Sequence, residues 1–302
     1  FGERSAVMTE FVRQVRQLLD RTARGGRRWL CARVPCYQSF LDPLGLDMKA
    51  LVAAGLDMVN ASATYFTTQR QQLAFIRRQT SGAKLYFEMC HSIWNGPRLT
   101  PGYDAFTFRR TTPEQFYTTA HLAYARGVDG MSTFNFVYYR DHGGEGRGPF
   151  DEPPFEILGH LSDRNWLARQ PQHWFLAKGW RPSGTKPTPV PRKVELGQAY
   201  PFFFDMAPPS GGWQKAGRLR VEAERPLGDS RWQAHFNDVA LVANDDVSEP
   251  YENPYSPLLG EPAARRAWTV PASALKDGGN RLDLTLEAGE PATIVYLDLA
   301  IS

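Results

Sequence analysis

The spacing of the hydrophobic residues changes once along this chain of 302 residues, and the change divides it into two unlike halves. Up to about residue 180, stretches with helical spacing alternate with short apolar runs that are typical of buried strands. A proline-rich segment from Arg181 to Pro191 follows. Beyond it, apolar and polar residues alternate with a period of two, as in half-buried antiparallel strands. We therefore predict one domain at 1–180, a linker at 181–192 and a β-sandwich at 193–302.

The first half favours an α/β arrangement. Strands are predicted at 29–34, 58–62, 84–90 and 130–136, and helices at 5–24, 47–54, 68–79, 112–126 and 155–177. Strands that alternate with helices indicate βαβ units around a parallel sheet. One short pattern occurs twice. A glycine is followed two residues later by an aspartate and then by a strand, first from Gly55 and again from Gly127. The two aspartates, Asp57 and Asp129, begin strands, and at that end of a sheet we expect them to be structural.

The lengths of the connections indicate which edge of the sheet carries function. Connections from helix to strand are short, whereas the segments 90–111 and 137–153, which follow strands, are long. Long loops gathered on one side of a compact domain usually carry binding or catalytic residues. In parallel α/β folds, ligands bind beyond the carboxyl ends of the strands.

Glu88 is the strongest candidate for a catalytic group. It lies at the end of the hydrophobic run 84–90, where a buried carboxylate is costly unless it has a function. Alternation along each strand predicts which polar side chains share its face of the sheet. These are Arg33, Asn60, Ser62, Tyr86, Thr133 and Asn135. The carboxyl ends of four strands therefore deliver polar groups to one place.

Aromatic and amide groups beyond the strand ends suit a sugar, whose ring stacks on aromatic side chains and whose hydroxyls need polar partners. The predicted substrate-binding residues are Arg33, Asn60, His91, Trp94, Asn135, Tyr138 and Asp141. His91 serves equally well as a cap on a strand end. Asp141 is either a second chemical group or a solvated loop residue.

Several classes of function are disfavoured. A net charge of +3 is small for this length, so nucleic acid is not an expected partner. The three cysteines lack the spacing of a zinc site, and no phosphate-binding or dinucleotide-binding glycine motif is present, so no metal or cofactor is predicted. No apolar run approaches the roughly 20 residues that span a bilayer. The sequence does not begin with methionine, so its start is expected to be processed, trimmed or incomplete. Localisation stays open, with secretion or the periplasm as the expectation.

The stretch from Phe11 to Ala177 resembles the C-terminal half of a TIM-barrel glycoside hydrolase of the glycosyl-hydrolase-like, family-10-like kind. The segments that carry the resemblance lie at 29–35, 45–49, 55–60, 85–88 and 127–136. The tail from about Lys193 is similar to galactose-binding-like β-sandwiches, which either bind sugar or brace the barrel; bracing is favoured. The fold expected from this resemblance is a (β/α)8-barrel portion of about four βα units followed by a β-sandwich.

This resemblance implies a role for Glu88. If 130–136 is the eighth barrel strand, Glu88 ends the seventh, which is the place of the nucleophile in retaining barrel hydrolases. The acid/base glutamate that ends the fourth strand has no counterpart, because four strands are counted where eight close a barrel. We expect the barrel to be completed by a missing N-terminal half or by a second chain. An inverting enzyme would use Glu88 as a base instead.

The resulting hypothesis is hydrolysis of O-glycosidic bonds in a poly- or oligosaccharide, with retention and with Glu88 as one of two catalytic carboxylates. The alternative is a carbohydrate-binding or scaffold protein without catalysis, which the missing second carboxylate and the β-sandwich favour. A barrel lyase or aldolase is weaker, because the candidate lysines, Lys49 and Lys84, lie at the starts of a helix and a strand.

Overall fold

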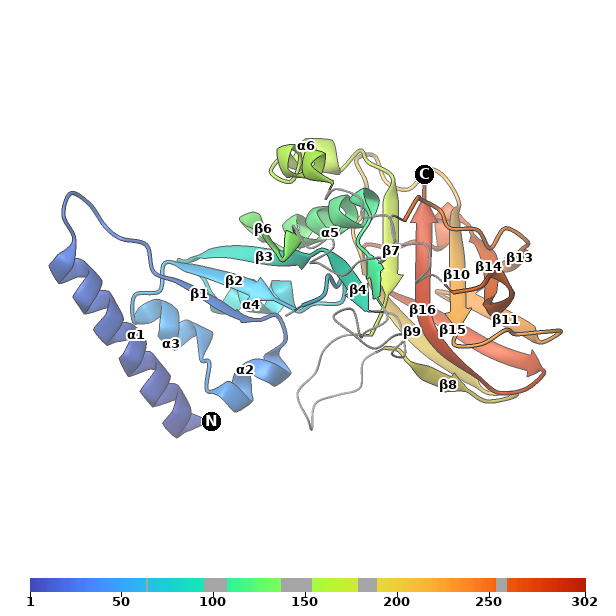
Figure 1. The fold of residues 1–302 in the computed structure, drawn as a ribbon, viewed down its shortest axis with the longest axis horizontal. Coiled ribbons are helices and arrows are strands. Elements are labelled where there is room, and N and C mark those ends of the chain that lie inside the picture. The colour runs from blue at the N-terminus through green and yellow to red at the C-terminus, as the bar shows by residue number, and fades with distance from the viewer. Residues whose placement is uncertain (64, 95–107, 137–153, 179–188, 254–259) are drawn as a thin grey trace, which may run out of the picture.

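The computed structural model describes residues 1–63, 65–94, 108–136, 154–178, 189–253 and 260–302, which form two units (Figure 1). The N-terminal unit contains a parallel sheet in the order β1-β2-β3-β6. Its strands are β1 (Cys31–Pro35), β2 (Met58–Ser62), β3 (Lys84–Cys90) and β6 (Gly130–Phe134). The helices are α1 (Gly2–Thr22), α2 (Gln38–Leu44), α3 (Met48–Ala53), α4 (Leu73–Gln79), α5 (Pro113–Ala125), the 3₁₀ helix η2 (Phe155–Gly159) and α6 (Arg164–Leu167). The predicted alternation of four strands with helices is confirmed.

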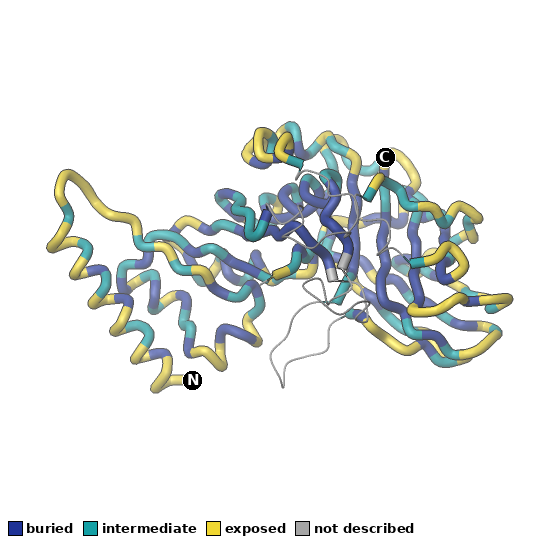
Figure 2. Tube along the Cα trace, in the orientation of Figure 1, coloured by how far each residue is buried: buried dark blue, intermediate teal, exposed yellow. Residues whose placement is uncertain are grey.

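Within the described residues this sheet is open, because β1 and β6 each pair on one side only. Helices cover one face, where Val59, Phe87 and Met89 pack with residues of α3, α4 and α5 in a buried core (Figure 2). The register of the strands turns Asn60 and Glu88 to the opposite face. Closure into a barrel therefore stays a prediction.

The sequence repeat has a structural cause, seen first at Asp57. Its backbone N–H donates to the carbonyl of Leu30 at 2.9 Å, and its carboxylate accepts from the Leu30 N–H at 2.8 Å. Arg16 of α1 donates to the same carboxylate at 3.0 Å. Gly55, with φ 110°, lies under the Arg16 side chain, where a Cβ would approach within 2.5 Å of it. A side chain at this glycine would push away the arginine that pairs with Asp57.

Asp129 repeats this arrangement at the start of β6. Its carboxylate accepts from the Leu85 N–H and from Arg77 of α4, both at 2.8 Å. Gly127 lies under the Arg77 side chain, as Gly55 lies under its arginine. Both aspartates thus join the amino ends of adjacent strands. The prediction that they are structural is confirmed.

Asp57→Asn is expected to lower the free energy of unfolding by about 1–2 kcal/mol at pH 7. Partial burial alone would raise the pKa of Asp57, but the Leu30 N–H and the Arg27 guanidinium outweigh it and hold the pKa below its ordinary value. A carboxyl whose pKa is lowered by folding stabilises the fold above its unfolded pKa of about 3.9. This contribution disappears as the pH falls through the folded pKa.

Urea unfolding at pH 7 and pH 3 measures this effect. The gap between wild type and Asp57→Asn should shrink at pH 3, and a gap of constant size would contradict the prediction. Asp20→Asn is the control, because Asp20 pairs with the same Arg16 but its side chain is 53% exposed. Asp20→Asn should lower the free energy of unfolding by less than about 1 kcal/mol.

Helix α5 begins where the sequence indicates. The Thr112 side chain accepts from the Gln115 N–H, the Gln115 side chain accepts from the Thr112 N–H, and Pro113 occupies the first turn. This capping box satisfies N–H groups that a helix start leaves unpaired. It fixes the end of the segment that leads from β3 to α5.

The C-terminal unit is a β-sandwich, as predicted. One sheet has the order β13-β14-β10-β16-β7, with β8 also on β16, and the other has the order β12-β11-β15-β9. The strands are β7 (Gln172–Leu176), β8 (Arg192–Val194), β9 (Ala199–Met206), β10 (Gly217–Ala223), β11 (Arg231–Phe236), β12 (Val239–Ala240), β13 (Val242–Asn244), β14 (Arg265–Val270), β15 (Gly278–Ala288) and β16 (Ala292–Ile301). Two 3₁₀ helices, η4 (Pro262–Ala264) and η5 (Ala272–Ala274), flank β14. Alternate residues of both sheets, among them Leu219, Phe236 and Leu284, form one core.

The prediction of a helix over 155–177 is wrong at its end. Residues Gln172–Leu176 form β7, which pairs antiparallel with Leu297–Ile301 of β16. All five residues of β7 are buried, so they lack the solvent-exposed face that a surface helix would show. The sandwich thus contains a strand that precedes the predicted linker. Most of that linker lies outside the described residues. The division at 181–192 stays a prediction.

Candidate active site at the carboxyl end of the parallel sheet

Glu88 lies near the carboxyl end of β3, on the face of the sheet opposite the described helices. Its neighbours in register are Ser62 on β2 and Ser132 on β6. The Glu88 side chain is 6% exposed. A carboxylate buried to this degree is tolerated only when hydrogen bonds replace its water.

Among the residues that the structure describes, three side chains donate those hydrogen bonds. Arg33 donates through Nε to both carboxylate oxygens at 3.0 and 2.9 Å and through its terminal nitrogen to Oε1 at 2.6 Å. Ser62 donates to Oε1 at 2.6 Å and Asn60 to Oε2 at 3.2 Å. We call these four residues the Glu88 cluster. The hydrogen bonds that Arg33 makes with Glu88 raise the pKa of the guanidinium, so Arg33 stays charged.

Two aromatic rings lie beside this cluster. The Arg33 guanidinium carbon lies 4.4 Å from the centre of the Phe134 ring, and Tyr65 meets the same ring edge to face at 5.5 Å. Tyr65 is 55% exposed. An exposed aromatic ring next to a charged cluster is the surface on which a sugar face can stack.

The other predicted residues are placed less directly. His91 is buried, and its Nδ1 lies 3.2 Å from the Cys90 sulfur. Asn135 follows β6 with a left-handed backbone, φ 53°. Trp94 ends β4 (Ser92–Trp94), which pairs with β5 (Phe108–Arg110).

Tyr138 and Asp141 lie outside the described residues, as do 139–153 and 95–107 of the two long loops. The structure therefore brings together Arg33, Asn60 and Glu88 from the predicted set. The remaining substrate contacts stay predictions.

The prediction for β6 was wrong by one residue. Thr133 was expected on the face of Glu88, but the register pairs Thr133 with Met89, whose side chain points to the helices. Ser132 takes the inward position, and its hydroxyl donates to the Asn60 oxygen at 2.8 Å. Gly130, the first residue of β6, has no side chain, so the alternation of polar and apolar residues did not show which face of the sheet Thr133 occupies.

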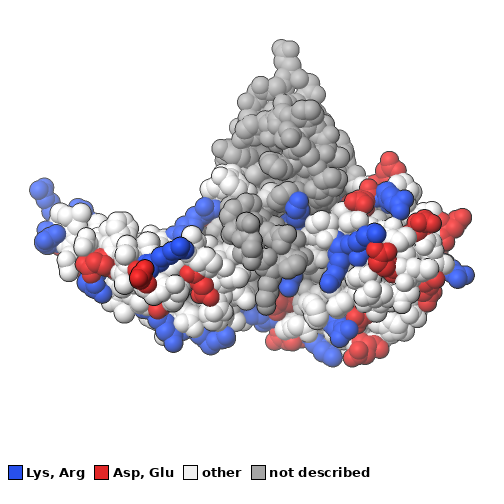
Figure 3. All heavy atoms as spheres, turned by 90° about the horizontal axis from the view of Figure 1, so that it is seen from below, with Lys and Arg blue, Asp and Glu red and all other residues white. Residues whose placement is uncertain are grey.

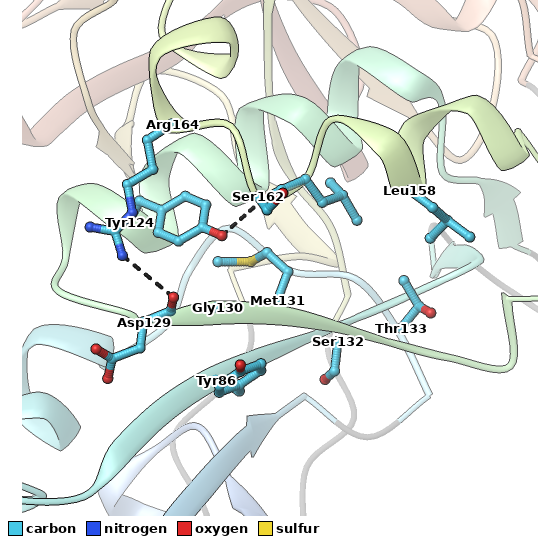
Figure 4. Close-up of a pocket in the computed structure, with 11 residues that line it drawn as sticks. Tyr86, Tyr124, Asp129, Gly130, Met131, Ser132, Thr133, Leu158, Ser162 and Arg164 are labelled. Atoms are coloured by element: carbon cyan, nitrogen blue, oxygen red, sulfur yellow. Dashed lines mark hydrogen bonds between the residues drawn. The ribbon is translucent and has the colours of Figure 1, made fainter.

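A pocket of about 410 Å³ lies beside this cluster, along the unpaired side of β6 (Figure 4). It is lined by Tyr86, Ser132 and Thr133 from the sheet, and by Tyr124 and Arg164 from α5 and α6. Glu88 is not among its lining residues. Ser132 joins the two, because it lines the pocket and also donates to Asn60 of the cluster.

Other chemistries find less support in the described residues. Burial raises the pKa of the Cys90 thiol to about 11, so it is protonated at neutral pH and is a poor nucleophile. Lys84 lies 3.6 Å from Asp129 at the amino end of the sheet, away from Glu88. No group of three His, Cys, Asp or Glu side chains suited to a metal ion occurs in these parts of the chain.

The described surface also bears on partners. On the face in Figure 3, acidic and basic side chains are interspersed over both units. None of the helices in the described ranges is long and apolar enough to cross a membrane.

Fold and site define an α/β unit with a buried, arginine-bound carboxylate at the carboxyl end of its sheet, joined to a β-sandwich. No protein-family model matches the sequence, and no curated protein matches it either.

Solved structures show a weak likeness. The protein called BuGH86wt, in complex with neoagarooctaose, is 16% identical, with 36% of this chain and 16% of that chain covered and a TM-score of 0.25. Dimeric latent PorU of Porphyromonas gingivalis is 12% identical, with 43% and 12% covered and a TM-score of 0.24. The β-porphyranase BpGH86A of glycoside hydrolase family 86, from Bacteroides plebeius, is 9% identical, with 98% and 74% covered and a TM-score of 0.27. The chain thus spans less than a fifth of the first two proteins, and these values assign it neither family nor activity.

Proposed function

We propose that this chain carries one of the two catalytic carboxylates, Glu88, of a glycoside hydrolase that cleaves O-glycosidic bonds in a poly- or oligosaccharide. The observation that carries the proposal is the Glu88 cluster, in which three donors hold a carboxyl group near the carboxyl end of a parallel strand. A glycosidase needs such a group as nucleophile or as base.

In this mechanism Glu88 attacks the anomeric carbon of the sugar while the glycosidic C–O bond breaks and the second carboxyl group protonates the departing oxygen. That second group then takes a proton from water, which hydrolyses the covalent glycosyl-enzyme intermediate with net retention. Arg33 and Ser62 fix the carboxylate before the sugar binds, which lowers the reorganisation needed in the transition state. Tyr65 and Trp94 stack the ring. Asn60, Asn135 and the loop residues contact its hydroxyls.

The second carboxylate comes from strands that close the sheet. No acidic side chain is among the described hydrogen-bond partners of Glu88, and both edges of the described sheet lack a partner strand. Closure, by further strands of the same polypeptide or by a second chain, brings a second carboxyl group about 5–5.5 Å away for retention. A separation of about 6.5–9.5 Å would make Glu88 the base of an inverting enzyme.

The test is the release of new reducing ends from a panel of neutral and sulfated oligosaccharides that includes neoagarooctaose. Product from wild type and none from Glu88→Gln is the expected result. Equal product from both proteins would remove Glu88 from the mechanism.

A non-catalytic carbohydrate-binding protein is the second candidate, and one observation favours it. The Glu88 carboxylate already receives donors from Arg33, Asn60 and Ser62, as in an ion pair whose role is to hold three strands together. This candidate predicts that no glycan of the same panel yields product. It also predicts a glycan affinity, measured by calorimetry, that is the same for wild type and for Glu88→Gln.

A further inference from the structure

A buried network of charges lies where the sandwich meets the N-terminal unit. It consists of three arginines and three carboxylates on one face of the larger sandwich sheet, and we call it the ionic cluster. Its members are Arg109 of β5, Arg220 and Glu222 of β10, Arg265 of β14, Asp298 of β16, and Glu249. Within the described residues its three positive and three negative charges balance, and balanced, paired charges are those that persist in a protein interior.

Arg109 is the member that the N-terminal unit contributes. Its side chain is 2% exposed and donates to Glu222 and, at 3.1 Å, to both oxygens of Glu249. Its guanidinium carbon also lies 4.0 Å from the centre of the Tyr296 ring. β5 is thus held by charges from the sandwich.

A short path leads from Arg109 to Glu88. Strands β4 and β5 pair antiparallel, and we call this pair the hairpin. Arg109 of β5 is the register partner of Ile93 in β4, which begins four residues after Glu88. Thr111 then clamps the end of β3, because its N–H donates to the His91 carbonyl and its hydroxyl donates to the Cys90 carbonyl, both at 2.9 Å. The backbone that follows Glu88 is therefore fixed by the residues around Arg109.

A second tether holds the segment after β2, the strand that carries Asn60. Gln69 is 3% exposed; its side chain donates to the carbonyl of His173 at 3.0 Å and accepts from the N–H of Phe175 at 2.8 Å. Both partners belong to β7 of the sandwich. In Figure 1 the carboxyl ends of β2 and β3 are directed toward the sandwich.

We infer that the sandwich is a positioning element of the active site and that Arg109 is its principal positioning residue. This inference rests on the proposed function of Glu88. The ionic cluster holds β5, β5 holds β4, and the hairpin together with Thr111 fixes the segment from Glu88 to Trp94. A sandwich attached only as a sugar-binding module would need no buried ions against this hairpin.

The experiment compares Arg109→Met with Arg16→Met. Both arginines are buried and paired with two carboxylates, but Arg16 lies at the amino end of the sheet. Hydrogen–deuterium exchange of the peptide 88–94 is followed without substrate, and kcat and KM are measured on the oligosaccharide that wild type cleaves best. Arg109→Met should speed exchange in 88–94 about tenfold and lower kcat more than it raises KM. Arg16→Met should leave both unchanged at a temperature where it is folded.

Two further variants separate position from stability. Arg109→Met/Glu222→Gln restores the charge balance and should recover melting temperature but not the protection of 88–94. Arg109→Lys should recover protection in part, because it returns the charge without the forked geometry. It also serves if the methionine variant does not fold.

Unchanged exchange and unchanged kcat in Arg109→Met would overturn the inference, as would full recovery of both in the double variant. The exchange measurement needs no substrate. Faster exchange in a protein that cleaves no glycan would therefore support the positioning role of Arg109 while the proposed hydrolase function fails.

Discussion

Replacing Glu88 by glutamine is expected to lower kcat/KM by roughly 10³-fold or more on any glycan that wild type cleaves. Glutamine keeps the size of the side chain, and its oxygen can still accept from Ser62 or Arg33, which reach the carboxylate at 2.6 Å. A neutral amide neither attacks an anomeric carbon nor takes a proton from water. Initial rates of reducing-end release measure the loss.

The fold should survive this change. Arg33 loses its charged partner, but its side chain is 43% exposed, so water can solvate the cation. We expect a loss of about 1 kcal/mol in unfolding free energy, which a thermal melt would show as a small shift. The loss of activity is therefore not a consequence of unfolding.

Asp129→Asn is the matched control, because it removes a carboxylate that pairs with Arg77 at the amino end of the same sheet. It should cost stability and leave kcat/KM close to wild type. Wild-type turnover in Glu88→Gln would contradict the assignment. If Asp129→Asn lost a comparable amount of activity, the losses in both variants would come from a general disturbance of the sheet and not from the chemistry of Glu88.

The sequence predicts the class of each unit well, because hydrophobic spacing reports which faces are buried. The strands that become β1, β2, β3 and β6 are recognisable as apolar runs, and the change to a period of two identifies the sandwich. The capping box at Thr112 and the aspartate at position 57 are local signals, so short segments suffice to identify them. Most of the Glu88 cluster follows from alternation along these strands.

The alternation of polar and apolar residues along a strand does not show whether solvent or another part of the chain covers the polar face of the sheet. Arg220, Glu222 and Asp298 occupy the polar positions of alternating strands, where solvent is the ordinary expectation. They are 3%, 5% and 1% exposed instead. Arg109 of β5 contacts Glu222, residues 247–249 contact Arg220, and Asp298 is bonded by Arg220 and His173. The contact of Arg109 with Glu222 joins residues more than a hundred positions apart, and no short-range pattern encodes it.

The same limit explains β7, because a short run of buried residues is found in buried helices and in buried strands alike. Its partner, β16, lies at the other end of the chain. Local sequence therefore predicts the elements, while the contacts that position the candidate site are long-range.

Asp298→Asn is expected to lower the free energy of unfolding by about 3–5 kcal/mol, which is a large fraction of the stability of a typical protein. The Asp298 side chain is 1% exposed and accepts from Arg220 at 2.9 Å and pairs with His173 at 3.0 Å. Removing its charge leaves the ionic cluster with one cation in excess and no water to solvate it. Guanidinium-chloride unfolding measures the loss.

The Asp298 carboxyl itself should add no pH dependence to this loss between about pH 5 and pH 8. Burial alone would raise the pKa of Asp298, but Arg220 and His173 outweigh it and hold the pKa well below its usual range. A pKa lowered by folding gives stability that is present above the unfolded value of about 3.9 and is lost only as the pH falls through the folded value. Neutral and mildly acidic buffers therefore leave the carboxylate ionised in both states.

Asp277→Asn provides the exposed comparison, because Asp277 pairs with Arg126 at 3.2 Å while its side chain is 62% exposed. It should cost less than about 1 kcal/mol, since water and side-chain freedom offset an exposed pair. If Asp298→Asn costs no more than this control, Glu249, which lies 2.8 Å from Arg220, satisfies the arginine alone. Charge balance would then contribute little to the stability of the ionic cluster, whereas the positioning role of Arg109, which rests on its direct contacts with Glu222 and Tyr296, would be unaffected.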